Sequence, residues 1–431
     1  MASDPKRQIR CAATLVSDPD ADRAAAETAD RLSDRLEGVG ADLLAVFISA
    51  HHAESAEPVA AALRSKLGPR ALIGVTGESV LAGATEAEGR PAIAAWALAG
   101  APLDIRPFTE DDLPPNPADD PDAAAGALGM DTTARATLLF ADPFSTPVLS
   151  LLPAMDAAAS AAGVPAAAPI FGGVASGGST AGEHRLLLDG RVRDRGLVGV
   201  TLAATPNADV RIDSVVSQGC RPIGPDLVIT NARGNAIQQL GGRPALAMVK
   251  ETLEALGDDD RALLERGLFL GRVVNEYKDR FGRGDYLIRA IVGAEPTSGA
   301  IAVNDLVRVG QTVRLHLRDA DTAHEDLALL LDGQKLHGPP AGGLLFTCNG
   351  RGAKLFGEPH HDAAAVVRAF APPEAGERLA KAGKPYAEQP TTDPERAVPL
   401  AGFFAGGEIG PIGGRPFLHG HTASLMLFRH A

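Results

Sequence analysis

The segment PLAGFFAGGEIGPIGGRPFLHGHTASLMLF, residues 399–428, shows most clearly how this chain is built. Residues 400–405 form an apolar run of strand length, and residues 417–428 form a second apolar run. Between them lies a glycine-rich loop, residues 406–414, that holds one carboxylate, Glu408. Each apolar run predicts a strand, and glycine in the loop between them allows a close backbone approach.

The same plan occurs twice more upstream, at 71–99 and at 169–203. With the segments that precede them, the three copies extend to residues 42–99, 136–203 and 343–428. Each reads as a buried strand, a polar loop, a helix, a second strand, a glycine loop and a closing strand. We therefore expect an α/β (α+β) fold with mixed, largely antiparallel sheets flanked by helices, and with internal repeats.

The organisation of the rest of the chain follows from its length and local composition. A chain of 431 residues predicts more than one domain, and we place the boundary between residues 1–205 and 206–431. Residues 106–133 are rich in Asp, Pro, Gly and Ala, which predicts a long surface loop or linker.

Composition and charge exclude several classes of function. The net charge of −13 argues against a nucleic-acid partner and against an anionic membrane surface. No stretch has the roughly 18 apolar residues that a membrane span needs, and the first 18 residues lack the apolar core of a signal peptide. We therefore expect a soluble, cytoplasmic protein with neither nucleic-acid nor membrane partners.

The motifs that usually indicate a cofactor or a catalytic serine are missing from the sequence. There is no phosphate-binding P-loop, no dinucleotide-binding glycine motif between a strand and a helix, and no Gly-x-Ser-x-Gly nucleophile turn. His419 and His421 could join His360 or His361 at a metal, but two histidines at this spacing are weak evidence. We expect no cofactor and no metal.

Five segments of the second half resemble the FIST family, with a FIST N-type domain followed by a FIST C-type domain. They are SQGCRPIGP at 217–225, GNAIQQLGGRPAL at 234–246, GDYLIRAIVGAEPTSGAIAVNDLVRVGQTVRLHLRDA at 284–320, LLFTCNGRG at 344–352 and AGFFAGGEIGPIGGRPFLHGHTASL at 401–425.

The first half matches the family more weakly, through IGVTGESVLAG at 73–83 and FGGVASGG at 171–178. Family members usually start the first of these loops with a Gly-Cys-Ser-like triplet, whereas this chain has Gly-Val-Thr at 74–76. The resemblance implies an intracellular sensory module for small ligands, for which amino acids have been proposed. It implies no catalytic residue, and it implies that any output passes through a separate signalling protein.

The loops at the ends of the repeat strands contain the residues that we expect to bind the ligand. Arg351 could pair with a ligand carboxylate at two points, with Cys348 and Asn349 beside it. Glu408, next to Gly407, could accept the ammonium group of an amino acid. The alternatives are an internal salt bridge for Arg351 and, for Glu408, hydrogen bonds within its own loop or a pair with Arg415 or Arg221.

Three further residues complete the predicted ligand site. Glu78 occupies in the first repeat the place that Glu408 occupies in the third. Cys220 and Arg221 lie in a Gly- and Pro-rich turn. The leading hypothesis is a sensory protein for a small ligand, without catalysis of its own. The alternatives are a thiol-dependent enzyme that uses Cys348 or Cys220, and a scaffold for a protein partner.

Overall fold

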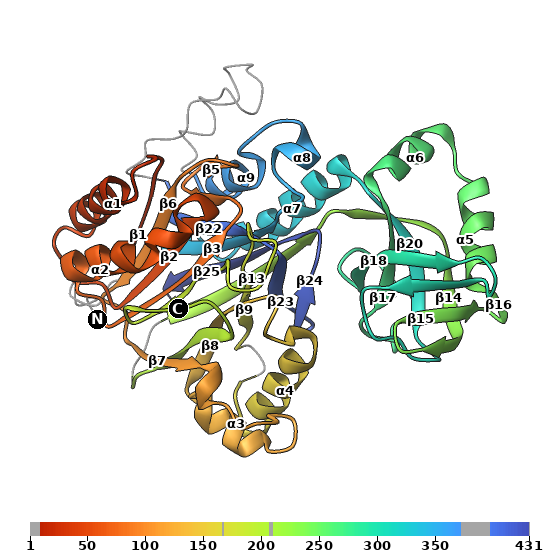
Figure 1. The fold of residues 1–431 in the computed structure, drawn as a ribbon, viewed down its shortest axis with the longest axis horizontal. Coiled ribbons are helices and arrows are strands. Elements are labelled where there is room, and N and C mark those ends of the chain that lie inside the picture. The colour runs from red at the N-terminus through yellow and green to blue at the C-terminus, as the bar shows by residue number, and fades with distance from the viewer. Residues whose placement is uncertain (1–8, 166–167, 207–209, 372–396, 431) are drawn as a thin grey trace. The chain divides into compact units, whose positions relative to one another are not determined.

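The computed structural model describes residues 9–165, 168–206, 210–371 and 397–430 (Figure 1). The first eight residues, which belong to the segment that we expect not to be a signal peptide, lie outside the described residues. The chain forms two compact units. The first comprises Met1–Val216, Leu330–Leu418 and Ala423–Ala431, and the second comprises Ser217–Leu329 and His419–Thr422. The domain boundary at 205/206 stays a prediction.

Three repeats make up most of the first unit, and each has the order of elements expected from the sequence. The first has β2 (Leu43–Ser49), α2 (Ala56–Leu67), β3 (Ala71–Gly77), β4 (Val80–Ala82), β5 (Thr85–Ala87) and β6 (Ile93–Ala99). The second has β8 (Ala134–Ala141), α4 (Val148–Ala161), β9 (Ile170–Val174), β10 (Leu186–Leu188), β11 (Arg191–Arg193) and β12 (Leu197–Ala204). The third has β21 (Gly342–Cys348), α8 (Ala353–Phe356), α9 (His361–Ala369), β22 (Leu400–Ala405), β23 (Gly407–Ile412), β24 (Arg415–His419) and β25 (Thr422–His430).

Strand pairing follows one pattern in all three repeats. The first strand pairs in parallel with the second strand, as in β2–β3, β8–β9 and β21–β22. It pairs antiparallel with the closing strand on its other side, as in β2–β6, β8–β12 and β21–β25. The structure thus confirms the mixed, largely antiparallel α/β fold and the three internal repeats.

The short hairpin of each repeat joins the sheet of another repeat. Strand β4 pairs with β22, β10 pairs with β3, and β23 pairs with β9. Each sheet therefore ends on one side with a borrowed hairpin. On the other side it ends with a further strand, which is β1 (Arg10–Val16), β7 (Leu103–Thr109) or β13 (Val210–Gln218). This cyclic exchange relates the three sheets to one another and ties them into one unit.

Glycine is required at one equivalent position in the second strand of each repeat. A Cβ on Gly402 would lie 1.7 Å from the carbonyl oxygen of Leu345 in the neighbouring strand. On Gly172 it would lie 1.8 Å from the carbonyl oxygen of Leu139. Gly74 faces a backbone oxygen in the same way, at 2.6 Å. These close approaches explain why glycine recurs in these otherwise apolar strands.

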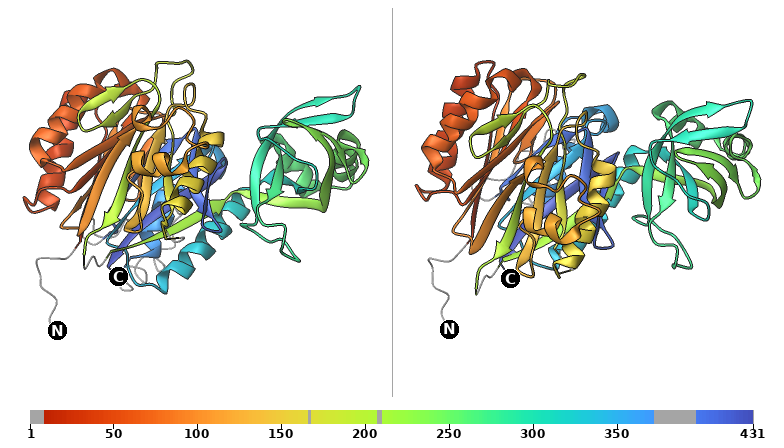
Figure 2. Two further views of the ribbon diagram at one scale, coloured as in Figure 1. Left: turned by 90° about the horizontal axis from the view of Figure 1, so that it is seen from below. Right: turned by 60° about the horizontal axis from the view of Figure 1, so that its bottom comes forward.

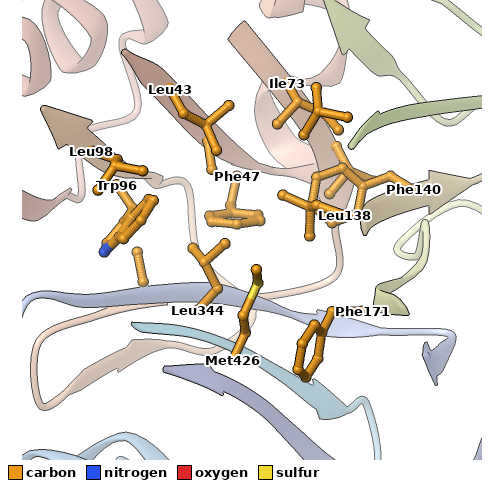
Figure 3. Packing of buried hydrophobic residues seen from close by; sticks show 14 of the residues in the cluster. Leu43, Phe47, Ile73, Trp96, Leu98, Leu138, Phe140, Phe171, Leu344 and Met426 are labelled. Atoms are coloured by element: carbon orange, nitrogen blue, oxygen red, sulfur yellow. The ribbon is translucent and has the colours of Figure 1, made fainter. Parts of the chain in front are cut away.

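The three sheets share one hydrophobic core in which aromatic side chains occupy equivalent places. Phe47, Phe140 and Phe346 lie near the ends of β2, β8 and β21, with ring centroids 5.9, 6.3 and 5.8 Å apart. Figure 3 shows Phe47 pointing towards side chains of the other two sheets, among them Leu138 and Leu344. Such edge-to-face contacts stabilise the centre of a core that is otherwise built from smaller side chains.

Helices cover the outer faces of these sheets. The α1 helix (Ala21–Arg35) is capped by Asp20, whose side chain accepts the backbone N–H of Arg23. It packs with α2 against the first sheet (Figure 2). The expectation of a loop at 106–133 was wrong in part. The end of β7 lies there, and so does α3 (Pro121–Ala127), which Asp120 caps and whose alanines pack with α4 in one core.

The second unit is a closed antiparallel barrel. Its elements are β14 (Cys220–Arg233), β15 (Ala236–Leu240), β16 (Arg243–Pro244), α5 (Ala245–Glu254), α6 (Asp258–Leu263), β17 (Leu268–Val273), β18 (Tyr286–Glu295), β19 (Ala300–Val303) and β20 (Thr312–Arg318). The strand order is β14-β20-β17-β18-β19-β15, and pairing of β14 with β15 closes the ring. The α7 helix (Ala320–Lys335) then leads the chain back to the first unit.

Candidate functional site

The loops that follow the second strands of the three repeats meet in the first unit. The Ser176 hydroxyl donates to the carbonyl oxygen of Phe404 at 2.5 Å and accepts the backbone N–H of Glu78 at 2.8 Å. A Cβ on Gly177 would lie 2.6 Å from the Cβ of Ala50, so this loop position needs glycine for a close approach. The repeat structure thus gathers the loops in which the sequence places several candidate ligand contacts.

Glu408 stands where the other two repeats have apolar side chains. In the hairpin of the third repeat, Glu408 pairs with Gly173 of the receiving sheet. In the hairpins of the first and second repeats, Val80 pairs with Phe403 and Leu186 pairs with Val75. These three partners each follow the glycine that approaches the neighbouring strand, so the three positions are equivalent. The expectation that Glu78 is the counterpart of Glu408 in the first repeat was therefore wrong, because Val80 occupies that place. The Glu408 side chain is fully buried. A buried carboxylate at an otherwise apolar position needs a reason other than packing.

Arg351 and Asp362 form a fully buried ion pair beside this position. The Arg351 Nε donates to Asp362 Oδ2 at 2.6 Å, and its Nη2 donates to Asp362 Oδ1 at 2.8 Å. Thr347 Oγ1 donates to the same carboxylate at 2.7 Å, and His361 Nδ1 lies 3.0 Å from it. Although burial alone would raise the pKa of Asp362, the Arg351 charge holds that pKa far below its usual value.

The third nitrogen of the Arg351 guanidinium, Nη1, does not take part in the ion pair with Asp362. In the part of the chain that the structure describes, Arg351 Nη1 is buried and has no hydrogen-bond partner. Because Asp362 occupies the Nε–Nη2 edge, the two-point pairing with a ligand that we expected cannot use that edge. Nη1 can still donate to another acceptor, and a buried unsatisfied donor on a charged group is costly.

The structure brings two predicted site residues, Cys348 and Glu408, into electrostatic reach of a third, Arg351. Burial opposes the charge on Arg351, yet Asp362, Cys348 and Glu408 together raise its pKa above the usual value. The half-buried Cys348 accepts the backbone N–H of Gly350 on its sulfur at 3.5 Å. These contacts place a thiol and a carboxylate around one guanidinium.

Asn349 and Gly407 belong to the same group of residues. The backbone N–H of Asn349 donates to the carbonyl oxygen of Ala405 at 3.2 Å, while its buried Oδ1 has no hydrogen-bond partner among the described residues. Gly407 precedes Glu408 in β23 and pairs with Val174 of β9. The cluster thus offers a spare donor, Arg351 Nη1, and a spare acceptor, Asn349 Oδ1.

Acidic side chains from the first repeat surround the Arg351 loop. Glu78 pairs with Lys354 at 2.7 Å, and Glu88 accepts the backbone N–H of Ala353 at 3.1 Å. Glu86 is buried and accepts the N–H of Ala363 at 3.0 Å. Burial first, and then repulsion from the nearby Asp362 carboxylate, raises the pKa of Glu86 to about 8.

Arg221 and Cys220 lie in the second unit, whereas Arg351 and Glu408 lie in the first unit, and a common site for the four residues stays a prediction. Arg221 pairs with Asp260 and lies 3.6 Å from Asp319. Cys220 is buried and lines a small cavity of about 60 Å³, together with His316. The Nδ1–H of His316 donates to the Arg314 carbonyl at 3.0 Å, and burial lowers its pKa to about 4, which keeps the ring neutral.

Sequence patterns did not identify Asp362 and Glu86 as members of the cluster. Asp362 lies in the first turn of α9 among alanines, valines and a histidine, where a buried side chain was predictable but its partner was not. A second buried pair, Asp142 and His184, joins two repeat loops at 2.9 Å. The second ring nitrogen of His184 accepts the N–H of Gly178 at 3.3 Å, so this pair holds loops together.

In the residues that the structure describes, no group of three or more His, Cys, Asp and Glu side chains could hold a metal ion. Within the same part of the chain, no helix combines the length and apolar character that crossing a bilayer demands.

Comparison with known proteins gives two family matches and close relatives over nearly the whole chain. Residues 42–243 match the FIST N domain and residues 245–377 match the FIST C domain. "Uncharacterized protein Rv0628c" of Mycobacterium tuberculosis (strain ATCC 25618 / H37Rv) is 40% identical over 418 residues, which cover 95% of this chain and 97% of that protein. "Uncharacterized protein Mb0898c" of Mycobacterium bovis is 37% identical over 429 residues, which cover 97% and 99%.

Among solved structures, a crystal structure of cyanuric acid hydrolase from A. caulinodans covers 98% of this chain and 99% of its own, with 11% identity and a TM-score of 0.29. That likeness is too distant to support an inference. FIST domains are in general sensory domains of signal-transduction proteins. The two domain matches and the relatives at 37–40% identity show that this chain belongs to the FIST family.

Proposed function

We propose that this protein is a sensor for a small carboxylate, such as an amino acid, which binds around Arg351 and Glu408. On this proposal the chain has no catalytic output of its own, acts in the cytoplasm and passes its signal to a separate protein. The observation that carries the proposal is the buried Nη1 of Arg351, which has no hydrogen-bond partner in the described part of the chain. A ligand carboxylate oxygen would satisfy this donor.

The charges around Arg351 support a ligand that carries both signs. Asp362 already neutralises Arg351, so a ligand carboxylate at Nη1 would meet a neutral pair rather than an isolated cation. Glu408 adds a negative group nearby, and its charge acts on Arg351. Glu408 would attract an ammonium group on the ligand, whereas it would repel a plain carboxylate. This arrangement favours an amino acid over a simple acid.

Burial of Glu408 supports a functional role for this side chain. Because the equivalent positions hold Val80 and Leu186, the fold itself has no need of a carboxylate there. Asn349 adds an acceptor, its buried Oδ1, which has no partner among the described residues and could receive a ligand N–H. Arg351 Nη1 and Asn349 Oδ1 thus offer one donor and one acceptor to a small zwitterion, beside the Glu408 carboxylate.

Isothermal titration calorimetry with a panel of amino acids and simple carboxylates tests this proposal. We expect at least one amino acid to bind, with affinity reduced at least about tenfold in Glu408→Gln, which removes the charge and keeps the shape. Lys354→Gln is the matched control, because it breaks the exposed Glu78–Lys354 pair outside the buried cluster. A ligand that binds Glu408→Gln as tightly as the wild type would refute the assignment.

One observation favours thiol chemistry at Cys348 as a second candidate function. Its sulfur accepts a backbone N–H and lies in electrostatic reach of Arg351, and both features stabilise a thiolate. Alkylation rates measured across pH test this, with Cys11 as an internal control because burial raises the pKa of that thiol far above its usual value. A Cys348 midpoint near the ordinary value of about 8.5 would remove the candidate.

A further inference from the structure

A cavity of about 320 Å³ lies in the first unit, apart from the cluster around Arg351. Small-molecule sites typically have volumes of roughly 300–1,000 Å³, so this cavity has room for a small ligand. Its wall includes β8, α4 and the turn of the hairpin that the third repeat lends to the second repeat's sheet. The cavity is thus formed by the exchange of a hairpin between repeats.

Away from the hairpin turn, the cavity wall combines apolar side chains with the hydroxyls of Thr137 and Ser160, and the Ser160 hydroxyl already donates to the carbonyl oxygen of Asp156 at 2.9 Å. Met130 and Ile170 are buried core residues that line it, and the half-buried Val164 packs against the same core cluster. Thr137, a polar side chain on the β8 side, is already satisfied through a hydrogen bond of 3.0 Å to the Thr201 hydroxyl. A ligand in contact with this part of the wall therefore needs an apolar body.

An arginine and an aspartate provide the charged end of the cavity. Arg415 donates from Nε to Asp156 Oδ2 at 2.9 Å, which orients the guanidinium from the hairpin towards α4. In the described residues the two Nη groups of Arg415 donate no hydrogen bond to protein atoms. They form a fork that matches the geometry of a carboxylate.

We propose that this cavity is a second ligand site, which takes a small aliphatic carboxylate. The carboxylate pairs with the Nη groups of Arg415, and the aliphatic body lies against Met130, Val164 and Ile170. This proposal is independent of the site at Arg351 and Glu408, since none of the cavity-lining residues belongs to that cluster. A ligand here contacts the turn of the hairpin whose first strand carries Glu408.

Titration with 4-methylpentanoate tests the proposal, because this molecule has the carboxylate and the branched aliphatic body and little else. We expect one molecule to bind per chain, while 4-methylpentanol, which lacks the carboxylate, binds at least about tenfold more weakly. Leucine serves as a third probe. If its added ammonium strengthens binding also in Glu408→Gln, where the site at Arg351 lacks its carboxylate, Asp156 accepts from it, and the ligand class narrows to apolar amino acids.

Two variants and two controls locate the binding. Ala159→Trp fills the cavity from α4, whereas Ala157→Trp places the same side chain at an exposed position of α4 that does not line the cavity. Arg415→Gln removes the carboxylate partner at an exposed position where folding is not at stake. We expect Ala159→Trp and Arg415→Gln to weaken binding at least about tenfold, and Ala157→Trp and Glu408→Gln to leave it unchanged.

Three results would overturn the proposal. The first is that 4-methylpentanoate does not bind the wild type, and the second is that it binds Ala159→Trp and Arg415→Gln as tightly as the wild type. The third is that Glu408→Gln abolishes binding while the two cavity variants keep it, because the ligand would then belong to the Arg351 site. Loss of amino-acid binding in Glu408→Gln with intact 4-methylpentanoate binding would support both sites separately.

Discussion

Arg351 and Asp362 hold each other in a two-point ion pair from which solvent is excluded, with N–O distances of 2.6 and 2.8 Å. The pair links the loop after β21 to the first turn of α9. It leaves one guanidinium nitrogen, Nη1, without a partner among the described residues. The pair is therefore both a structural contact and the base of the proposed ligand site.

Removing one member of this pair should lower the free energy of unfolding far more than removing both members. Asp362→Leu leaves the Arg351 charge buried without its partner, so we expect the free energy of unfolding to fall by about 3–5 kcal/mol. In the double variant Arg351→Met/Asp362→Leu, most of this loss should be recovered. Urea denaturation followed by the fluorescence of Trp96, the single tryptophan, reports on the first unit. A double variant as unstable as the single one would contradict this interpretation.

Replacing Glu408 by an apolar residue should separate folding from binding. Because Val80 and Leu186 occupy the equivalent positions, we expect Glu408→Leu to change the free energy of unfolding by no more than about 1 kcal/mol. The same variant should lose amino-acid binding in a titration. A large loss of stability would show instead that the Glu408 carboxylate maintains its own loop, as one of the sequence-based alternatives holds.

The raised pKa of Glu86 predicts a pH-dependent stability. Burial first, and then repulsion from Asp362, raises this pKa from 4.5 to about 8. Between these pH values the folded chain keeps a proton that the unfolded chain has released, so the free energy of unfolding falls as pH rises from about 4.5 to about 8. Glu86→Gln removes this titration.

We therefore expect Glu86→Gln to be more stable than the wild type by at least about 1 kcal/mol at pH 8, with a smaller difference at pH 5. Urea denaturation at the two pH values measures it, with the exposed Glu57→Gln as the control. A difference that does not change with pH, or that grows towards pH 5, would show that Glu86 is ionised in the folded chain.

The repeat glycines predict a contrast between two alanine substitutions. Gly402→Ala drives a Cβ to 1.7 Å from the Leu345 carbonyl oxygen, which only a shift of the paired strands can relieve. We expect it to destabilise the first unit by more than about 3 kcal/mol. Gly126→Ala, in α3 and with no atom within 4 Å of the new Cβ, should be neutral or slightly stabilising. Thermal unfolding of both variants measures the contrast, and similar melting temperatures would argue against so close an approach of β21 to β22.

Much of the first unit could be predicted from the sequence because its signals are local. Continuous apolar runs identified β2, β8 and β21, and glycine loops at equal places identified three repeats. The partner of each hairpin could not be predicted. A strand as short as Val80–Ala82 carries no pattern that distinguishes its own sheet from that of another repeat.

The candidate site was predictable only in part, for a related reason. Arg351 and Glu408 were identifiable because charged residues in glycine-rich apolar segments are unusual. Their grouping depends on Asp362, whose place in the site follows from how α9 packs. Arg221 lies in the separate barrel unit, and contacts between residues far apart in sequence cannot be derived from local patterns alone.

The most direct test of the proposed ligand site is an experimental electron-density map of protein purified from cells, inspected around Arg351 Nη1. We predict density for a small molecule with a carboxylate oxygen within about 3.2 Å of Nη1 and with a polar group towards Glu408. A map in which Nη1 donates to a protein atom, and in which any bound small molecule lies elsewhere, would contradict the proposed ligand site.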